Sequence, residues 1–424
     1  MVKDLLYYVL IFVFVLGYLG IVFEKFLHVN KAAIALTMAV LCWFLYLIPT
    51  HGTEELLKGH FAEQVSDVAQ VIFFLLAAMV IVELIDSHRG FSVITDILYS
   101  SSKRRMLWFL VGLSFFMSSV LDNLTSMIVI ASLLRKMVKN KEDRWFLGSM
   151  VVIAVNAGGA WTPIGDVTTT MLWINDKITT WAIIRSLFFP SVVCAAVAAV
   201  LATFMLKKER EEEKTVMAHL PLEPGAKRVL WMGIGALVFI PIWKTVFGIP
   251  PFMGALLGLG LLWLFTDILH FRYGEERWHL RVGHVLTRID MSGVIFFLGI
   301  LLAVNALQGP GILKDFALFL EKIVPNQNYV AVLIGLLSSV VDNVPLVAAT
   351  MGMYDMTLFP TNAPLWQLIA YAAGTGGSIL IIGSAAGVAL MGIEKIDFIW
   401  YLRKVTWIAL VSYFAGLLVY FFFL

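Results

Sequence analysis

Charged residues are scarce in this sequence. They make up 14% of its 424 residues, whereas 60% are hydrophobic and the mean hydropathy is +0.88. A soluble domain has about a quarter of its residues charged and about half apolar. The composition therefore excludes a soluble globular protein and predicts a chain that crosses a lipid bilayer several times. The net charge of +2 gives no indication of a nucleic-acid partner.

Cysteines and enzyme motifs are also lacking. The two cysteines, Cys42 and Cys194, lie in apolar runs, where core positions are expected rather than a disulfide or a metal pair. The sequence has no Walker loop, no dinucleotide fingerprint, no serine-hydrolase elbow and no His/Cys cluster at metal-ligand spacing. We therefore expect no enzyme and no cofactor. The eight histidines lie in loops or near the ends of apolar runs, where interfacial placement explains them.

Long apolar runs, by contrast, are abundant. Two of them, 145–174 and 366–393, are interrupted by Gly, Pro and small polar residues, which predicts helices broken near their middle. Eight others approach or exceed the roughly 20 residues that a spanning helix needs. These eight are 5–23, 31–48, 68–86, 181–206, 228–247, 251–270, 290–308 and 399–422. The sequence thus predicts an all-α polytopic membrane protein with about ten spans.

Two further apolar segments, 106–138 and 328–358, each carry an Asp-Asn pair at their centre. Basic residues flank the first segment on both sides, at 103–105 and 135–144. Because basic loops mark the cytoplasmic face, a single crossing would leave only one end basic. We therefore interpret both segments as re-entrant hairpins.

The remaining loops alternate in charge along the chain. This alternation predicts that both chain termini lie outside. Segments 90–105 and 309–325 mix apolar and charged residues, which fits interfacial helices or plain loops equally well. The basic loops are 24–31, the 207–228 linker and 271–288, and the balanced or acidic ones are 49–67 and 309–327.

The two halves of the chain repeat each other. Ser-Ser-Val-Leu-Asp-Asn-Leu-Thr at 118–125 and Ser-Ser-Val-Val-Asp-Asn-Val-Pro at 338–345 share five of eight residues at an offset of 220. Each half has five predicted spans, and an odd number inverts the second half relative to the first. The predicted organisation is a first inverted repeat at 1–206, a cytoplasmic linker at 207–227 and a second inverted repeat at 228–424.

Carboxylates inside the apolar segments are few and therefore informative. They are Glu83, Asp122, Asp166 and Asp342, and no Lys or Arg falls near the middle of any predicted span. A buried carboxylate without a basic partner must be protonated or bound to a cation, because a bare charge there is too costly. Protons and a metal cation would then compete for the same oxygens, as in a cation/proton antiporter. Glu83, near the end of its span, fits an accessory role or snorkelling to the interface equally well.

Hydroxyls, amides and freed carbonyls surround these acids, and they are the hard oxygen ligands that Na⁺ or Li⁺ requires. We expect the cation at Asp122, Asn123 and Asp166, because Ser384 replaces Asp166 in the second repeat. Helix capping by the Asp-Asn pairs and close packing at the glycines are the structural alternatives. The candidate cation- and proton-binding residues are Asp122, Asn123, Thr125, Asn156, Thr162, Asp166, Thr168, Thr169, Ser338, Asp342, Asn343, Thr375 and Ser378.

In these stretches the chain resembles the NhaD family of Na⁺/H⁺ antiporters, within the ion transporter superfamily. The resemblance covers nearly the whole chain and is most specific at 118–125, 156–169, 338–343 and 375–378. It implies a bacterial inner-membrane protein that exports Na⁺ or Li⁺ against entering protons. The superfamily also implies a homodimer, in which a transport domain slides past a scaffold by an elevator-type motion. Spans one to three and six to eight would form that scaffold.

The same superfamily holds divalent anion/sodium symporters and arsenite-type efflux proteins. A dicarboxylate or oxyanion transporter on the same fold is therefore the main alternative. Anion carriers of the superfamily tend to present Ser-Asn-Thr at the hairpin tips, where this chain has Asp122 and Asp342. Together with Asp166, these acids would repel a dicarboxylate. A channel-like or sensory membrane subunit is the alternative from another class.

Overall fold

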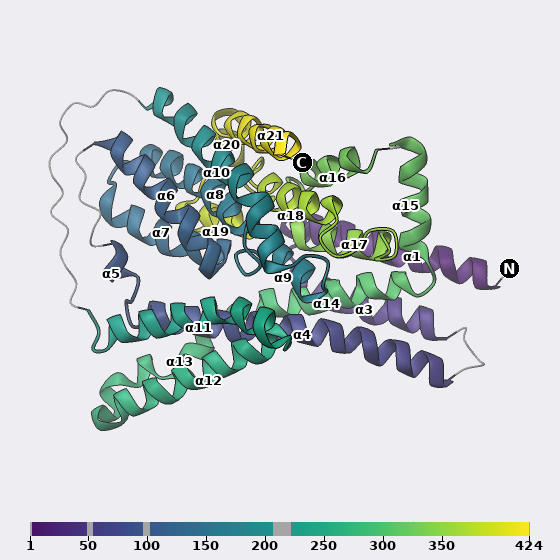
Figure 1. The fold of residues 1–424 in the computed structure, drawn as a ribbon, viewed down its shortest axis with the longest axis horizontal. Coiled ribbons are helices and arrows are strands. Elements are labelled where there is room, and N and C mark those ends of the chain that lie inside the picture. Colours follow the sequence, from purple (N-terminus) through teal and green to yellow (C-terminus); the bar gives the residue numbers. More distant parts are fainter. Residues whose placement is uncertain (1, 49–53, 96–101, 207–221, 325, 424) are drawn as a thin grey trace.

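The computed structural model describes residues 2–48, 54–95, 102–206, 222–324 and 326–423. Within these ranges every regular element is a helix and no strand is present, so the predicted all-α class is confirmed. Most long helices lie side by side along one direction (Figure 1). Seven described helices are long and apolar enough to cross a membrane, or eight when the bent pair at 398–422 counts as one span. The chain is a multi-pass membrane protein.

One set of helices comes from the start of each half of the chain, and we call it the first helix group. Its members pack on one another, with α3 against α1 and α14, and α4 against α11, α12 and α14. Its helices α3, α4, α11, α12 and α14 occupy the lower part of Figure 1. It comprises α1 (Val2–Val22), α3 (Lys31–Leu47), α4 (Glu54–Ser87), α11 (Ala226–Phe247), α12 (Pro251–His270) and α14 (Met291–Gln308).

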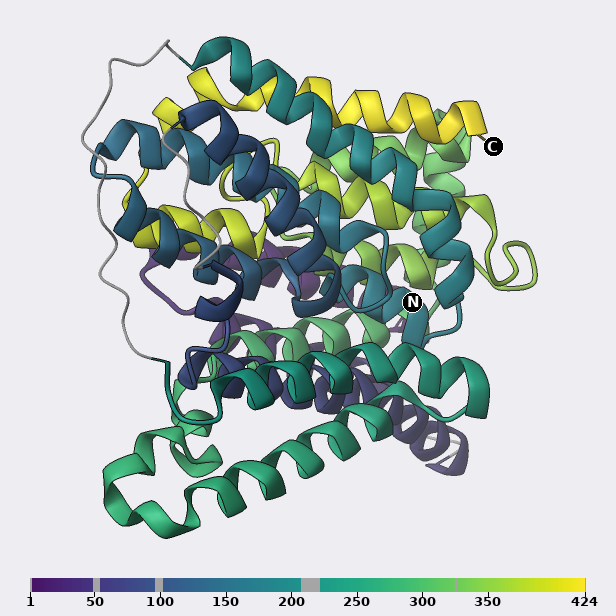
Figure 2. The same cartoon turned by 60° about the vertical axis from the view of Figure 1, so that its left-hand side comes forward.

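The helices of the hairpin segments and of the broken helices, together with α10, α20 and α21, form the second helix group, which lies above most of the first in Figures 1 and 2. Helices of the two halves interleave within it, since α19 packs on α7 and α8, and α18 packs on α8 and α9. From the first half it contains α6 (Lys103–Leu121), α7 (Asn123–Met137), α8 (Lys141–Ala160), α9 (Val167–Ile174) and α10 (Thr180–Met205). From the second it contains α16 (Gln327–Leu337), α17 (Asn343–Met353), α18 (Pro364–Gly376), α19 (Ala385–Glu394), α20 (Phe398–Lys404) and α21 (Thr406–Phe423).

The interruptions predicted in 145–174 and 366–393 are present. Residues 161–166 separate α8 from α9, and residues 377–384 separate α18 from α19. Glycines allow these breaks to pack tightly, because a Cβ on Gly158 would collide with the carbonyl of Phe115, and one on Gly376 with that of Gly335. Each broken helix is thereby pressed against the hairpin segment of its own half.

The hairpin segments break at their Asp-Asn pairs. In the first, α6 ends at Leu121 and α7 begins at Asn123, with Asp122 between them at a φ of +78°. In the second, α16 ends at Leu337 and α17 begins at Asn343. Helix α6 is by itself long and apolar enough to cross a membrane. The re-entrant course of the hairpin segments therefore stays a prediction. The inverted relation of the two halves of the chain also stays a prediction.

Some loop predictions need correction. The predicted loop 49–67 is wrong for residues 54–67, which form the first turns of α4, since helical hydrogen bonding continues outward past the apolar run. Of the two alternatives for 309–325, a helix is correct, because α15 spans Ile312–Ile323. The predicted linker at 207–227 falls largely on 207–221, outside the described residues. Short helices fill the other loops: α2 (Glu24–Leu27), α5 (Ser92–Thr95), η1 (Phe271–Leu280), α13 (Val282–Val285) and η2 (Leu286–Arg288).

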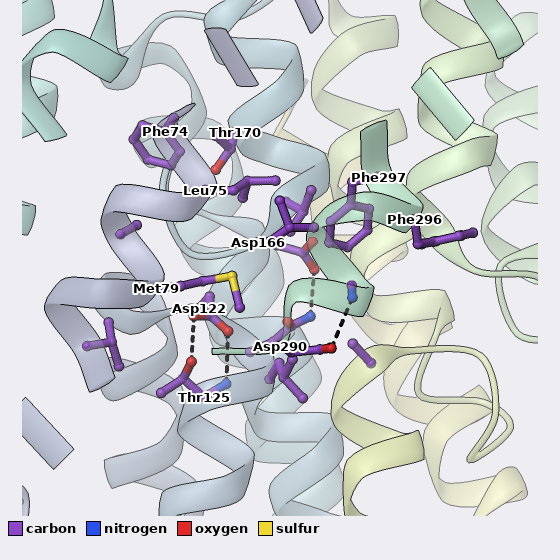
Figure 3. Close-up of a pocket in the computed structure, with 18 of the residues that line it drawn as sticks. Phe74, Leu75, Met79, Asp122, Thr125, Asp166, Thr170, Asp290, Phe296 and Phe297 are labelled. Atoms are coloured by element: carbon purple, nitrogen blue, oxygen red, sulfur yellow. Dashed lines mark hydrogen bonds between the residues drawn. The ribbon is translucent and has the colours of Figure 1, made fainter. Parts of the chain in front are cut away.

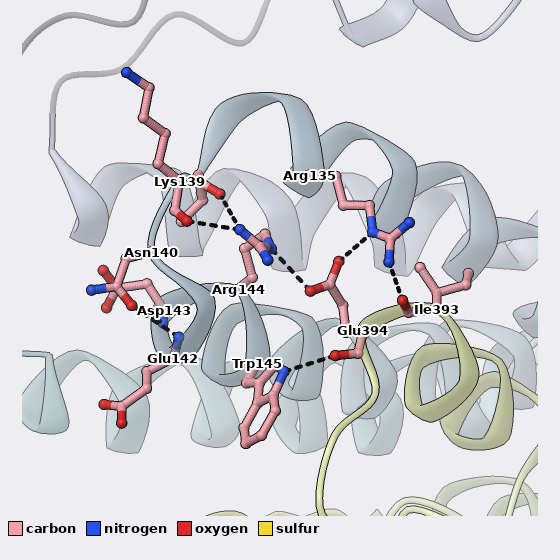
Figure 4. Close-up of polar contacts among 10 residues, drawn as sticks. Arg135, Lys139, Asn140, Glu142, Asp143, Arg144, Trp145, Ile393 and Glu394 are labelled. Carbon is pink, nitrogen blue, oxygen red and sulfur yellow. Dashed lines mark hydrogen bonds and ion pairs between the residues drawn. The ribbon is translucent and has the colours of Figure 1, made fainter.

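A buried ion cluster connects α19 to α7 and α8, the helices of the second group that come from the first half of the chain (Figure 4). Glu394, the last residue of α19, is 4% exposed. Its Oε1 accepts a hydrogen bond from Arg135 Nε at 2.7 Å, and its Oε2 accepts one from Arg144 Nε at 2.9 Å. The Trp145 indole donates to the main-chain carbonyl of Glu394, and Arg135 donates to that of Ile393. The cluster therefore holds α7, α8 and α19 together.

Candidate cation site

A cavity of about 290 Å³ lies between the two helix groups (Figure 3). Phe74 and Leu75 of α4 and Phe296 and Phe297 of α14 form its apolar wall on the side of the first group. The opposite side is formed by the helix breaks of the second group, including the predicted site residues Asp122, Asn123, Thr125, Asp166 and Asp342. The cavity thus joins polar groups of both hairpin segments and of one broken helix.

The described lining of this cavity is strongly acidic. It contains five carboxylates, those of Glu24, Asp122, Asp166, Asp290 and Asp342, against one basic side chain, that of Lys31. A concave surface with apolar walls and charge of one sign focuses its field and concentrates counter-ions. The cavity therefore favours a small cation and disfavours an anion.

Asp166 lies where the two halves meet. Its side chain is 2% exposed, and its Oδ1 accepts a hydrogen bond from Thr168 N at 3.0 Å, which caps the start of α9. Its Oδ2 accepts hydrogen bonds from Asn123 Nδ2 at 2.9 Å and from Asn343 Nδ2 at 3.4 Å. One carboxylate oxygen is therefore shared by the asparagines of both Asp-Asn pairs.

Asn156 extends this network to the second broken helix. Its Oδ1 accepts a hydrogen bond from Asn123 Nδ2 at 3.1 Å, and its Nδ2 lies 2.9 Å from the hydroxyl oxygens of Ser378 and Ser384. All of these side chains are buried. Ser384 was not among the predicted site residues, although its equivalence to Asp166 in the repeat was the sequence signal that could have included it.

Asp122 caps the helix that follows it and also faces the cavity. Its Oδ1 accepts a hydrogen bond from Thr125 N at 2.9 Å, and its Oδ2 accepts one from the Thr125 hydroxyl at 2.8 Å. Its positive φ is uncommon for a residue other than glycine and is held by this cap. Capping and cavity lining therefore coexist at Asp122.

The prediction that the buried carboxylates lack basic partners is wrong for two of the four. Lys31 Nζ lies 3.3 Å from Asp342 Oδ2. Lys31 begins α3 at the end of an apolar run, from which its long side chain reaches inward. Glu83, near the end of α4, lies 3.8 Å from Arg288 and does not line the cavity, which fits the snorkelling alternative. No ion pair to Lys or Arg occurs at Asp122 or Asp166 in the described part of the chain.

Four of the predicted hydroxyl residues donate to main-chain carbonyls rather than to carboxylates. Such bonds hold the helix breaks in shape, and a direct role of these four in ion binding stays a prediction. The pairs are Thr162 with Ser119, Thr169 with Asp166, Ser338 with Ala373, and Thr375 with Tyr371.

The described residues contain no group of three or more His, Cys, Asp or Glu side chains placed to hold a metal ion. Any cation bound here would need amide, hydroxyl or carbonyl oxygens in addition to carboxylates. These weaker oxygen ligands suit an ion that must also be released. The residues around Asp166 offer this mixture of donors.

Comparison with known proteins adds an independent line of evidence. The family model described as citrate transporter matches residues 18–366. Sodium/proton antiporter 1 of Arabidopsis thaliana is 50% identical over 410 residues, which cover 96% of this chain and 71% of the relative. Sodium/proton antiporter 2 of the same plant is 47% identical over 412 residues, covering 96% and 97%. The Na⁺/H⁺ antiporter NhaD of Alkalimonas amylolytica is 29% identical over 421 residues, covering 92% and 85%.

Proposed function

Because the chain belongs to the citrate transporter family and, within it, to the NhaD-type ion transporters, we propose that it exchanges Na⁺ for H⁺ across a membrane. The observation that carries this proposal is the acidic cavity with Asp166 at the junction of the two halves. The protein is thus a transporter rather than an enzyme, and the transported ions are its substrates.

The charge of the cavity argues for a cation over the anion that the family description names. Citrate carries several negative charges and would face five carboxylates offset by one lysine. Like charges in such a confined space repel strongly. A sodium ion instead gains from each acid. The family relationship therefore fits a cation-transporting member better than a citrate carrier.

The exchange follows from the cost of buried charge. Asp122 and Asp166 have no basic partner in the described chain, so each is stable only when protonated or next to a cation. Entry of Na⁺ from the cavity displaces the proton, and re-protonation releases Na⁺. The same carboxylate oxygens bind either Na⁺ or H⁺, but not both at once. The two ions therefore cross the membrane in opposite directions, which is antiport.

The two helix groups also support the predicted elevator-type motion. The hydrogen-bonded network of Asn123, Asn156, Asp166, Asn343 and Ser378 lies wholly on the second helix group. The first group faces that network with the apolar wall formed by the side chains of Phe74, Leu75, Phe296 and Phe297, and it reaches the second group beside the network through the ion pair of Lys31 with Asp342. Sliding of the second group along this wall would carry the ion with its ligands intact. The ten-span inverted repeat and a homodimer formed through the first group complete this proposal.

The finer predictions rest on the resemblance stated above. They are the transport of Li⁺ beside Na⁺, export as the direction, and a bacterial inner membrane with both termini outside. The relatives include plant as well as bacterial proteins. Localisation by a fluorescent fusion in the source cell would test the membrane assignment.

Reconstitution tests the function itself. The purified protein in liposomes with a pre-formed pH gradient should dissipate that gradient on addition of Na⁺, and not take up labelled citrate. Asp122→Asn and Asp166→Asn should each abolish the response, because the carboxylate that exchanges H⁺ for Na⁺ is gone. Asp355→Asn is the matched control, since Asp355 is an exposed acid outside the cavity. Citrate uptake by the wild type, or full activity in both cavity variants, would refute the proposal.

A further inference from the structure

The two hairpin aspartates are held by different partners. Asp122 receives two neutral donors from Thr125, its main-chain N–H and its hydroxyl. In the second repeat Pro345 stands at the position of Thr125, and proline offers neither a hydroxyl nor an N–H. Asp342 Oδ1 accepts a hydrogen bond from Val344 N at 3.3 Å, which leaves Oδ2 to a partner from elsewhere.

That partner is Lys31, whose Nζ lies 3.3 Å from Asp342 Oδ2. Lys31 belongs to the first helix group and Asp342 to the second, 311 positions apart in the chain. The same ammonium lies 4.3 Å from the centre of the Phe296 ring, a cation–π contact that fixes it over the cavity wall. With 35% of its side chain exposed, Lys31 shares the cavity of Asp122 and Asp166.

We propose that Lys31 is a tethered cation that occupies the second copy of the ion site. The ammonium neutralises Asp342, so the cavity takes up one exchangeable cation, at Asp122 and Asp166, instead of one for each copy of the repeat. A metal ion at Asp342 would have to displace a positive charge already in contact with the carboxylate. The inference rests on the proposed function and adds the number of ions carried, with Lys31 as a positioning residue that sets it.

The neutral variant Lys31→Met keeps an unbranched side chain, one atom shorter, and removes its charge. Asp342, whose side chain is 20% exposed and lines the cavity, then has no counter-charge and should bind a cation itself. Equilibrium binding of radioactive Na⁺ to the purified full chain in detergent should rise from about one ion per chain to about two. Lys31→Arg should stay at about one, because the charge is retained.

The double variant Lys31→Met with Asp342→Asn should return to about one ion per chain, since the vacated carboxylate is gone. A count that stays at one in Lys31→Met, or at two in the double variant, would overturn the inference. A wild type that binds no Na⁺ would instead remove the proposed function on which the inference rests. The two failures are therefore distinguishable.

A second measurement covers the case in which Lys31→Met does not fold. Asp342→Asn alone leaves the ammonium of Lys31 unpaired in the cavity, where it repels an incoming cation. The half-saturating Na⁺ concentration should rise about tenfold and return towards the wild-type value in the double variant. If the pair of Lys31 and Asp342 were only structural, the variants would change stability, and the double variant would not restore the half-saturating Na⁺ concentration. An unchanged half-saturating Na⁺ concentration in Asp342→Asn would refute the tethered cation.

Discussion

Replacing Glu394 by Gln should weaken the contact of α19 with α7 and α8. The substitution keeps the shape of the side chain and removes one negative charge. The glutamine oxygen can still accept from one guanidinium, but its amide group would then face the other with hydrogens opposed. The ion pairs with Arg135 at 2.7 Å and Arg144 at 2.9 Å are therefore replaced by one neutral hydrogen bond and one repulsive contact.

The size of the effect follows from the exposure of the three side chains. Glu394 is 2% exposed at its side chain, and breaking a buried ion pair costs about 3–5 kcal/mol. Arg135 is 54% exposed, so water recovers much of its loss. Arg144 keeps the main-chain carbonyls of Val138 at 3.0 Å and Lys139 at 2.8 Å as acceptors. We therefore expect a loss of about 2–3 kcal/mol, which is at or below the lower bound of that range.

Thermal unfolding of the purified protein in detergent measures this loss. Asp355→Asn is the matched control, because its ion pair with Lys314 is 3.5 Å long and both side chains are exposed, so it should cost less than about 1 kcal/mol. The half-saturating Na⁺ concentration should not change in Glu394→Gln, since Glu394 does not line the cavity. Equal melting shifts in the two variants would show that burial of this cluster contributes no stability.

Three further predictions concern other parts of the molecule. Gly376→Ala should prevent correct packing of α18, because the added Cβ would collide with the Gly335 carbonyl. Size-exclusion chromatography should then show aggregation. Gly260→Ala is the control, because a Cβ at Gly260 meets open space. Asn123→Ala removes a donor from Asp166 and should weaken Na⁺ binding about tenfold in the direct binding assay, and an unchanged affinity would contradict the network. Burial lowers the pKa of His88 below its ordinary value of 6.5, so the folded state resists its protonation. Stability should then be full above pH 6.5 and fall as the pH drops below it, and His88→Gln should flatten this dependence in melting curves.

Local polarity singled out residues that line the cavity, such as Asp122 and Asp166, but it did not predict their hydrogen-bond partners. Asp122, Asp166 and the glycines of the broken helices stand out because polar and flexible residues are costly inside apolar runs. Those same residues mark the helix breaks in the structure. That Asn343 reaches Asp166, 177 positions away, depends on how the two halves interleave in space. No local pattern encodes that register.

Lys31 shows the limit most clearly, since a lysine at the end of an apolar run is already explained as a topological signal. Only the fold brings it to Asp342. With Lys31 in place, the differences between the repeats act in one direction. Ser384 replaces the acid Asp166, Pro345 replaces the donor Thr125, and Lys31 neutralises the acid that remains. Each change removes negative charge or a polar group from the second copy, which is consistent with the proposal of a single ion site centred on Asp166.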